Sequence, residues 1–298
     1  MKIRALLGLI CSVLGLNIGA AQTDSIGGVG TQNALLWRIS GKGLAQPSYL
    51  YGTIHIIAAK DFFLTTATKS ALSSVERVTF EIDMDKMTNP IRQLGMIRKA
   101  VMPHGMTLQK LLTTKEYAEV SAFFAQKGMQ MTLLDRVKPL FLTALTTDES
   151  ASMKDGSTKS YEMELYKIAQ DSDKKVSGLE TMAFQMAVFD SIPYADQAKM
   201  LYESIKGGNE SEQQFERMVA CYKAQDLDCL QAEMQSGEDM GSYEDVLLND
   251  RNRNWIPLMA AQMEKQPVFF AVGAGHLPGQ NGVITLLRAQ GYTVTAVR

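Results

Sequence analysis

The chain has 298 residues, enough to bury a core as one large domain or as two domains of ordinary size. Hydrophobic residues make up 46% of it and charged residues 21%, which are globular values and exclude disorder and coiled coil. The formal net charge of -2 provides no basic field for nucleic acid or for an anionic membrane. Composition therefore predicts a globular protein that does not bind nucleic acid.

The N-terminus has the order of a secretory signal peptide. Met1–Arg4 is basic, Ala5–Leu16 is almost uninterruptedly apolar, and Gly19–Ala21 supplies small residues before a polar stretch. The apolar run is short for a bilayer crossing, and no later segment is apolar enough to span a membrane. We expect a signal peptide at 1–21, a flexible lead-in at 22–33, and a mature protein that is periplasmic or secreted.

Two cysteines remain after the signal peptide is removed. Cys221 and Cys229 flank a stretch that is typical of a turn between two helices. In an oxidising compartment a disulfide between them is the favoured interpretation, with two buried thiols as the alternative. A metal site there is disfavoured because no third or fourth ligand lies nearby in the sequence.

The mature chain begins with a β-β-α-β pattern. Strands are predicted at 34–40 and 48–53, joined as a hairpin by the turn Gly41-Lys42-Gly43. A helix at 64–75 and a strand at 77–83 follow.

Helical patterns then dominate as far as about residue 265. Helices are predicted at about 89–101, 107–112, 114–127, 139–145, 161–170, 181–189, 194–205, 211–224, 227–235 and 250–265. Residues 148–159 are predicted as a loop and 174–179 as a short strand, while Pro193 and Gly207-Gly208 are expected to break helices.

The C-terminus predicts a strand at 268–272, a helix at 282–290 and a closing strand at 292–297. The α/β patterns at both ends predict one mixed sheet built from the N- and C-terminal segments, with a large helical insertion. We expect a single α/β domain over 34–298 with a helical subdomain at about 89–265.

Polar residues stand at or just after the carboxyl ends of several predicted strands. They are His55, Glu81, Glu180 and His276, with Asp83 as a weaker candidate at the end of the same strand as Glu81. Ligands of open α/β sheets bind at this edge, because loops and helix N-termini meet there. Residues far apart in the sequence are thus predicted to form one site.

These residue types suit a divalent metal. Two imidazoles and a carboxylate can hold Zn, Mn, Co or Fe, and such an ion lowers the pKa of water enough for hydrolysis. Gly52 and Gly273 allow sharp turns, and Gly275 removes a side chain beside His276. Each candidate also has a structural interpretation: a histidine that ends a strand, a carboxylate at the first turn of a helix (Glu180), or a helix-surface cation (Arg251).

The motifs as a set resemble the TraB/PrgY/GumN family, and its exported GumN-like branch in particular. The matching stretches are Leu50–His55, Phe80–Asp83, Gly178–Thr181 with Gln185, Asp250–Trp255, and 272–292. The resemblance implies an erythromycin-esterase-, ChaN- and TraB-like fold shared with the Tiki-type metalloproteases, which need a divalent ion such as Mn or Co. The family's paired glycine-x-x-histidine motifs fall on Gly52–His55 and Gly273–His276, its acidic position on Glu81, and its arginine-asparagine pair on Arg251-Asn252.

The sequence therefore predicts an exported metal-dependent hydrolase, most specifically a peptidase that acts on a peptide or another small substrate. His55 and His276 would bind Mn, Co or Zn, and Glu81 would be a ligand or a general base. Arg251 would stabilise an oxyanion, and Glu180 would hold Arg251 or a histidine in place. Thr53 and Asn252 would support the site. The alternative is a non-catalytic periplasmic protein that binds a peptide or a cofactor in the same cleft. A purely structural helical scaffold leaves the paired motifs unexplained.

Overall fold

The computed structural model describes residues 33–87, 99–143, 145–146, 156–235 and 243–298. The predicted signal peptide, all but the last residue of the lead-in, most of the helix at 89–101 and most of the loop at 148–159 lie outside these residues. Within the described ranges, none of the helices combines the length and the apolar character that a bilayer crossing requires.

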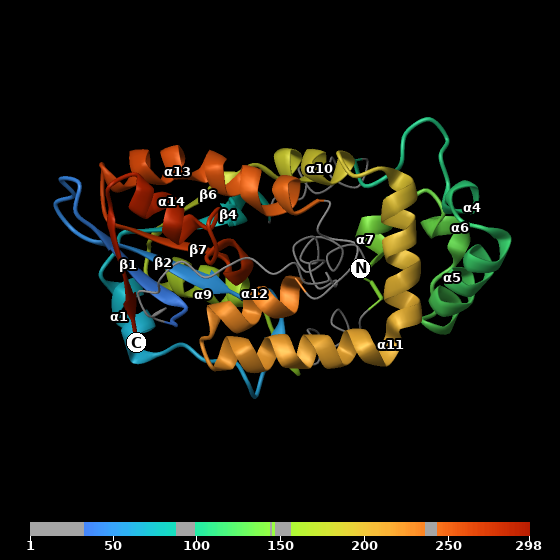
Figure 1. The fold of residues 1–298 in the computed structure, drawn as a ribbon, viewed down its shortest axis with the longest axis horizontal. Helices are drawn as coiled ribbons and strands as arrows, with labels where there is room; N and C mark the ends of the chain where they lie inside the picture. Colours follow the sequence, from blue (N-terminus) through green and yellow to red (C-terminus); the bar gives the residue numbers. More distant parts are fainter. Residues whose placement is uncertain (1–32, 88–98, 144, 147–155, 236–242) are drawn as a thin grey trace, which may run out of the picture.

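A six-stranded mixed sheet forms one end of the molecule (Figure 1). Its strands are β1 (Leu36–Ser40), β2 (Ser48–Thr53), β4 (Arg77–Ile82), β6 (Lys175–Glu180), β7 (Val268–Gly273) and β8 (Thr293–Val297), in the order β6-β4-β7-β2-β1-β8. Strands β6, β4, β7 and β2 are parallel, whereas β1 is antiparallel to β2 and β8. This topology confirms the predicted sheet of N- and C-terminal segments, including the β1–β2 hairpin.

Strand β7 lies inside the sheet between β4 and β2. Its run Val268-Phe269-Phe270-Ala271-Val272 is buried throughout, as expected for a parallel strand that is covered on both faces. Thr53 of β2 pairs with Gly273 of β7, so these two strands end level with each other. The register therefore brings the two glycine-histidine motifs to one edge of the sheet.

Helices pack on both faces of the sheet (Figure 1). On one side lie α13 (Asp250–Met263) and α14 (Val283–Ala289), and on the other lies α9 (Tyr161–Asp171). Helices α1 (Thr66–Ser73), α2 (Met84–Met87) and α12 (Leu227–Gln235) complete this half of the molecule. N-cap hydroxyls begin α1 and α9, where Thr65 and Ser160 accept hydrogen bonds from the first turn.

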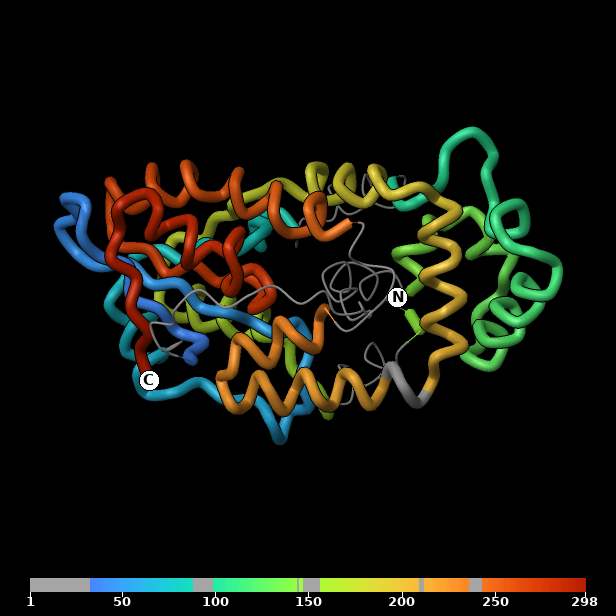
Figure 2. The backbone as a smooth tube through the Cα atoms, viewed as in Figure 1, coloured from blue at the N-terminus to red at the C-terminus, as the bar shows by residue number. Residues whose placement is uncertain are grey.

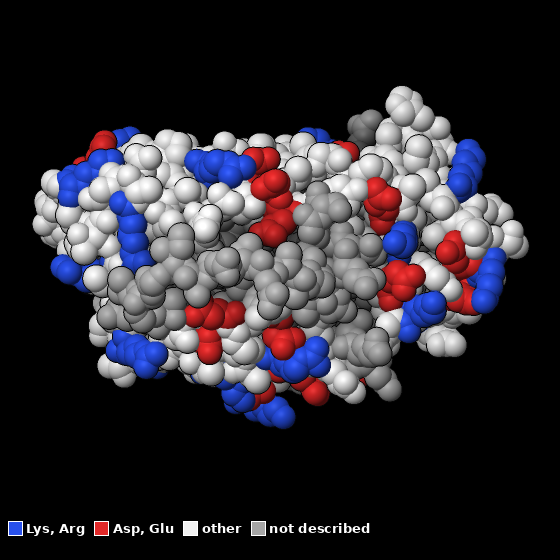
Figure 3. All heavy atoms as spheres, viewed as in Figure 1, with Lys and Arg blue, Asp and Glu red and all other residues white. Residues whose placement is uncertain are grey.

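A helical arm forms the other end of the molecule (Figure 1). We define it as α4 (Leu108–Leu111), α5 (Thr114–Gln126), α6 (Met131–Leu134), α7 (Pro139–Thr143) and the N-terminal part of α11 (Tyr194–Lys223). It has its own core, which includes Leu108, Val120, Phe124, Leu142 and Leu201. Helix α10 (Met182–Asp190) connects β6 to the arm. On the face shown in Figure 3, charged side chains of both signs are interspersed.

Three local features differ from the sequence prediction. The two helices predicted at 194–205 and 211–224 are one helix, α11, bent at Gly208, where φ is 35° and ψ is -106° (Figure 2). The glycine allows a sharp bend without ending the helix. A small second sheet pairs β3 (Ile57–Ala58) with β5 (Thr158–Lys159). Strand β5 lies at the end of the stretch that was predicted to be a loop, 148–159. A π-helical turn, η2 (Asp245–Asn249), precedes α13.

The division into one domain with a helical subdomain at about 89–265 stays a prediction. The structure adds that β6, which comes from within this stretch, belongs to the main sheet.

Candidate active site

The three side chains predicted to bind metal surround Gly273 at the end of β7. An ideal Cβ atom at this glycine would lie 3.3 Å from Glu81 Oε1, 3.6 Å from His276 Cδ2 and 3.8 Å from His55 Nε2. The backbone of Gly273 has an ordinary negative φ of -52°, so conformation alone does not require glycine here. The missing side chain instead leaves the space on which the three polar groups converge.

His276 lies in a short 3-10 turn, η3 (Ala274–His276), and is buried. Its Nδ1 is 2.6 Å from Oδ1 of Asn252. The amide nitrogen of Asn252 donates to the carbonyl oxygens of Asn281, at 2.9 Å, and of His276, at 3.4 Å. With its nitrogen committed in this way, Asn252 presents its oxygen to the ring, so Nδ1 of His276 carries the proton and Nε2 carries a lone pair.

His55 is held in the same manner by a residue that sequence reasoning missed. Its Nδ1 lies 3.0 Å from Oε1 of Glu162, in the first turn of α9. Glu162 also accepts hydrogen bonds from the hydroxyls of Thr53, at 2.7 Å, and Ser160, at 3.1 Å. The contact at Nδ1 leaves Nε2 of His55 to face Gly273.

The two imidazoles have opposite pKa shifts. Burial lowers the pKa of His276 to about 3, with the Glu81 carboxylate opposing and Arg251 adding to the effect. Burial also acts to lower the pKa of His55, but the carboxylate of Glu162 outweighs it and raises this pKa to about 8. The pKa of Glu162 is lowered, because His55 outweighs the effect of its burial. At neutral pH His276 is therefore neutral, and in the metal-free protein His55 is protonated and paired with the Glu162 carboxylate.

Arg251 links the two carboxylates of the site. Its Nη2 donates to Oε2 of Glu81 at 2.6 Å, and its Nε donates to Oε1 of Glu180 at 3.0 Å. Its Nη1 donates to the carbonyl of Leu247 at 3.1 Å and approaches Nε2 of His276 at 3.3 Å. Its Nη2 also donates to Oε2 of Glu180 at 3.0 Å, so all five guanidinium hydrogens point at acceptors, which fixes the plane of this buried cation.

Glu81 is satisfied at both oxygens. Oε1 accepts from the backbone N–H of Gly273 at 2.8 Å, and Oε2 accepts from Gln185 at 3.2 Å as well as from Arg251. Burial alone would raise the pKa of Glu81, but Arg251, His276 and His55 together hold it well below its usual range. Burial would likewise lower the pKa of Arg251, and the two carboxylates raise it instead. Both groups are therefore charged.

The remaining predicted residues lie around this centre. Gly52 packs against the turn after β7, where a Cβ would lie 3.1 Å from Ala274 Cα. Gly275 faces Met234 of α12, and a Cβ there would collide with the thioether. Asp83 instead pairs with Lys86, so it is a helix-start carboxylate and not a site residue. The predicted disulfide between Cys221 and Cys229 is present and ties α11 to α12.

The donor set fits a divalent cation in kind. Each imidazole has its Nδ1 bound by an outer acceptor and its Nε2 near Glu81, which is the arrangement common around metal-bound histidines. These side chains are not assembled into a closed ligand cluster, however. In the part of the chain that the structure describes, no group of three or more His, Cys, Asp or Glu side chains is positioned to hold an ion. Arg251 lies against both Glu81 and His276 instead.

Fold and site together define a mixed α/β protein with a buried centre of two histidines, two glutamates and an arginine at the carboxyl edge of its sheet. The profile of the TraB/PrgY/gumN family matches residues 35–296, and the chain belongs to this family. This confirms the resemblance seen in the motifs.

Curated relatives are named as metalloproteases. The chain is 23% identical to metalloprotease TIKI1 of Danio rerio over 88% of its own length and 63% of the relative's. It is 22% identical to metalloprotease TIKI2 of Danio rerio and to metalloprotease TIKI1 of Homo sapiens, over 88% of its own length and 60% and 61% of theirs. The chain thus spans less than two thirds of the length of these relatives. No solved structure matches it.

Proposed function

We propose that the protein is an exported metal-dependent hydrolase, and specifically a peptidase, with its active site around Gly273. One observation carries the proposal: His55 Nε2, His276 and Glu81 Oε1 converge on the space beside this glycine. Contacts at Nδ1 orient both imidazoles: Glu162 binds His55 and Asn252 binds His276. The names of the curated relatives support metal dependence and protease activity, and the basic, apolar and small-residue order of the N-terminus supports export.

The side chains would divide the chemistry as follows. A divalent cation such as Mn, Co or Zn, held by Nε2 of His55 and of His276, supplies a Lewis acid that lowers the pKa of water and polarises a carbonyl. Glu81 fits the role of a ligand better than that of a general base, because a carboxylate with so low a pKa has little tendency to accept a proton.

Arg251 would stabilise the negative charge that develops on the carbonyl oxygen during hydrolysis. It is charged and buried, and Glu180 binds its Nε and Nη2 while Leu247 binds its Nη1. A fixed positive charge of this kind costs no reorganisation when the negative charge forms, so it acts mainly on the transition state. Trp255 donates to Glu180 at 2.8 Å and holds that carboxylate in turn.

The alternative is a protein that binds a peptide or a cofactor at this edge without catalysis. The observation that favours it is the position of Arg251, which occupies acceptor atoms of Glu81 and of His276 that a metal ion would use.

Peptide cleavage with matched histidine variants tests the proposal. The mature protein, stripped with EDTA and then given Mn, Co or Zn, is assayed on a mixed peptide library by mass spectrometry. We expect metal-dependent cleavage in the wild type and in His104→Ala, whose histidine lies in a turn at φ 55° on the segment before the helical arm. His55→Ala and His276→Ala should lose it. Cleavage that survives both substitutions, or no cleavage with any of the three metals, contradicts the proposal.

A further inference from the structure

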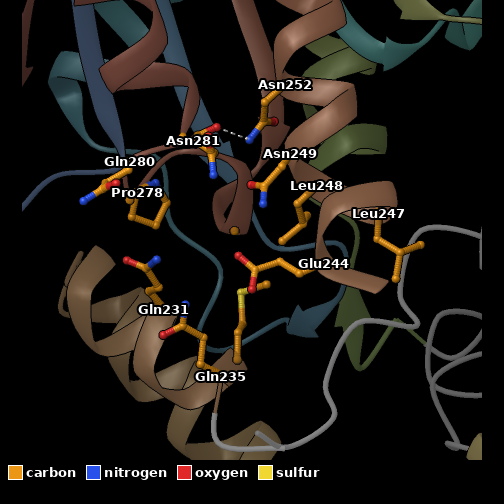
Figure 4. Close-up of a pocket in the computed structure, with 14 residues that line it drawn as sticks. Gln231, Gln235, Glu244, Leu247, Leu248, Asn249, Asn252, Pro278, Gln280 and Asn281 are labelled. Atoms are coloured by element: carbon orange, nitrogen blue, oxygen red, sulfur yellow. Dashed lines mark hydrogen bonds between the residues drawn. The ribbon is translucent and has the colours of Figure 1, made fainter. Parts of the chain in front are cut away.

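A cavity with several carboxamides in its lining lies next to the histidine centre, between α12 and the loop that follows His276 (Figure 4). It has a volume of about 100 Å³. Its lining includes Gln231 and Gln235 of α12, Glu244 and Asn249 from the segment before α13, and the loop residues 278–282. His55, Glu81 and His276 do not line it, so it is distinct from the centre around Gly273. Asn252, whose Oδ1 lies 2.6 Å from Nδ1 of His276, and Gly275, which precedes His276 in the chain, are part of the lining.

Carboxamides dominate the polar lining of this cavity. Five of them, Gln231, Gln235, Asn249, Gln280 and Asn281, accompany Asn252 around it. The side chains of Gln231, Gln235 and Gln280 have no hydrogen-bond partner among the described residues. A carboxamide offers a donor and an acceptor side by side, which matches the N–H and C=O groups of a peptide backbone. The lining thus suits a ligand rich in amide groups.

Glu244 is the one ionisable side chain in the lining. Its carboxylate points into the middle of the cavity (Figure 4). Within the described residues it forms no hydrogen bond or ion pair. Two arginines contact the lining: Arg251 donates to the carbonyl of Leu247 at 3.1 Å, and Arg253 reaches the side chain of Asn281 at 3.5 Å. Both are paired with other carboxylates, Arg251 with Glu81 and Glu180 and Arg253 with Asp250. A partly enclosed carboxylate without a counter-ion favours a cationic ligand and disfavours an anionic one.

We infer that this cavity binds a positively charged group of a peptide, an ammonium on a lysine side chain or at a free N-terminus, with Glu244 as its counter-ion. The carboxamides of α12 and of the 278–282 loop bind the adjoining peptide groups. The inference rests on the proposed peptidase function and specifies its substrate. The cavity adjoins the proposed catalytic centre through Asn252 and Gly275, which line it next to His276.

Direct binding of three tripeptides to the mature full chain tests this site without any need for catalysis. The probes are acetylated and amidated Ala-Lys-Ala, amidated Ala-Ala-Ala with a free N-terminus, and acetylated and amidated Ala-Ala-Ala. Binding is measured by calorimetry in EDTA, which prevents turnover. We expect one or both cationic probes to bind at least about tenfold more tightly than the neutral one. Which of the two binds distinguishes the lysine side chain from the N-terminus.

Charge variants of Glu244 provide the decisive comparison. Glu244→Gln should remove the preference for the cationic probe, and Glu244→Lys should transfer it to acetylated and amidated Ala-Glu-Ala. Glu216→Gln, which removes an exposed carboxylate from α11, should bind like the wild type. Equal binding of all probes to the wild type, no binding of any probe, or an unchanged preference in Glu244→Gln overturns the inference. Because binding is measured without metal, these outcomes stay separate from the cleavage assay: cleavage without charge-selective binding refutes only the cavity, and the reverse refutes only the peptidase.

Discussion

Asn252 Oδ1 lies 2.6 Å from Nδ1 of His276, and this contact determines which nitrogen of the imidazole faces the rest of the site. Glu162 makes the equivalent contact to Nδ1 of His55, at 3.0 Å. Two histidines that are 221 positions apart are thus oriented by the same device, once with an amide and once with a carboxylate. Of the two acceptors only Glu162 is charged. Burial lowers the pKa of His276, whereas the carboxylate of Glu162 outweighs the effect of burial at His55 and raises its pKa.

Asn252→Ala should weaken metal binding and also destabilise the fold. The substitution removes the acceptor for Nδ1 of His276 and the donor to Asn281. We expect the dissociation constant for Mn or Zn to rise by about 10–100-fold, and the free energy of unfolding to fall by about 1–3 kcal/mol. Calorimetry and urea denaturation measure the two effects. Asn254→Ala, on the exposed side of the same helix, is the control and should change neither.

Glu162→Gln should remove a pH dependence of stability in the metal-free protein. The folded pKa of His55, about 8, lies above its unfolded value of about 6.5. The His55–Glu162 pair therefore stabilises the protein fully below pH 6.5, and this stabilisation is lost as the pH rises through 8. It amounts to no more than about 2 kcal/mol.

Urea denaturation in EDTA at pH 6.5 and at pH 8.5 measures this effect. The wild type should be less stable at the higher pH, and Glu162→Gln should show the smaller difference. An identical difference in both proteins would show that the pair does not govern this pH range.

Gly273→Ala should weaken metal binding while the protein remains folded. The added methyl group would occupy the space between Glu81 Oε1 and His55 Nε2, and the backbone φ of -52° accepts alanine. We expect at least a tenfold loss of metal affinity, with a change in unfolding free energy below about 1 kcal/mol. Gly291→Ala provides the opposite case, because φ there is 90° and a Cβ atom at Gly291 would meet no other atom within 4 Å. It should destabilise the fold by about 1 kcal/mol and leave metal affinity unchanged.

Replacing Cys221 and Cys229 with serine should destabilise the hairpin of α11 and α12. The bond closes a short loop with a sequence separation of 8, for which chain entropy predicts about 2.5 kcal/mol. Urea denaturation with and without reductant measures this value, since reduced wild type should match the double serine variant. An unchanged midpoint on reduction would mean that helix packing alone holds α12 in place.

Local patterns predicted much of the fold because they report periodicity and turn chemistry. Strand β2 and helix α12 begin and end at the predicted residues, 48–53 and 227–235. The bend at Gly208 was harder to predict from the sequence, since a glycine pair in a helical pattern can either end a helix or bend it. The π-helical turn η2 has no sequence pattern of its own, and it depends on how α13 packs.

The site could be located in advance because parallel strands deliver their ends to one edge of a sheet. That rule predicted the grouping of His55, Glu81, Glu180 and His276. It could not identify Glu162, which begins a helix and is read from the sequence as an ordinary first-turn carboxylate. Its contact with His55 arises only when α9 packs on the sheet. For the same reason Arg251 could not be distinguished from a surface cation until its burial was known.

The metal content of the protein as purified from its cells tests the central claim most directly. Inductively coupled plasma mass spectrometry should find one bound divalent ion per chain in the wild type and in His104→Ala, and none in His55→Ala or His276→Ala. A wild-type protein that carries no divalent ion and takes up none from Mn, Co or Zn solutions would contradict the account. So would an ion that stays bound after both site histidines are replaced.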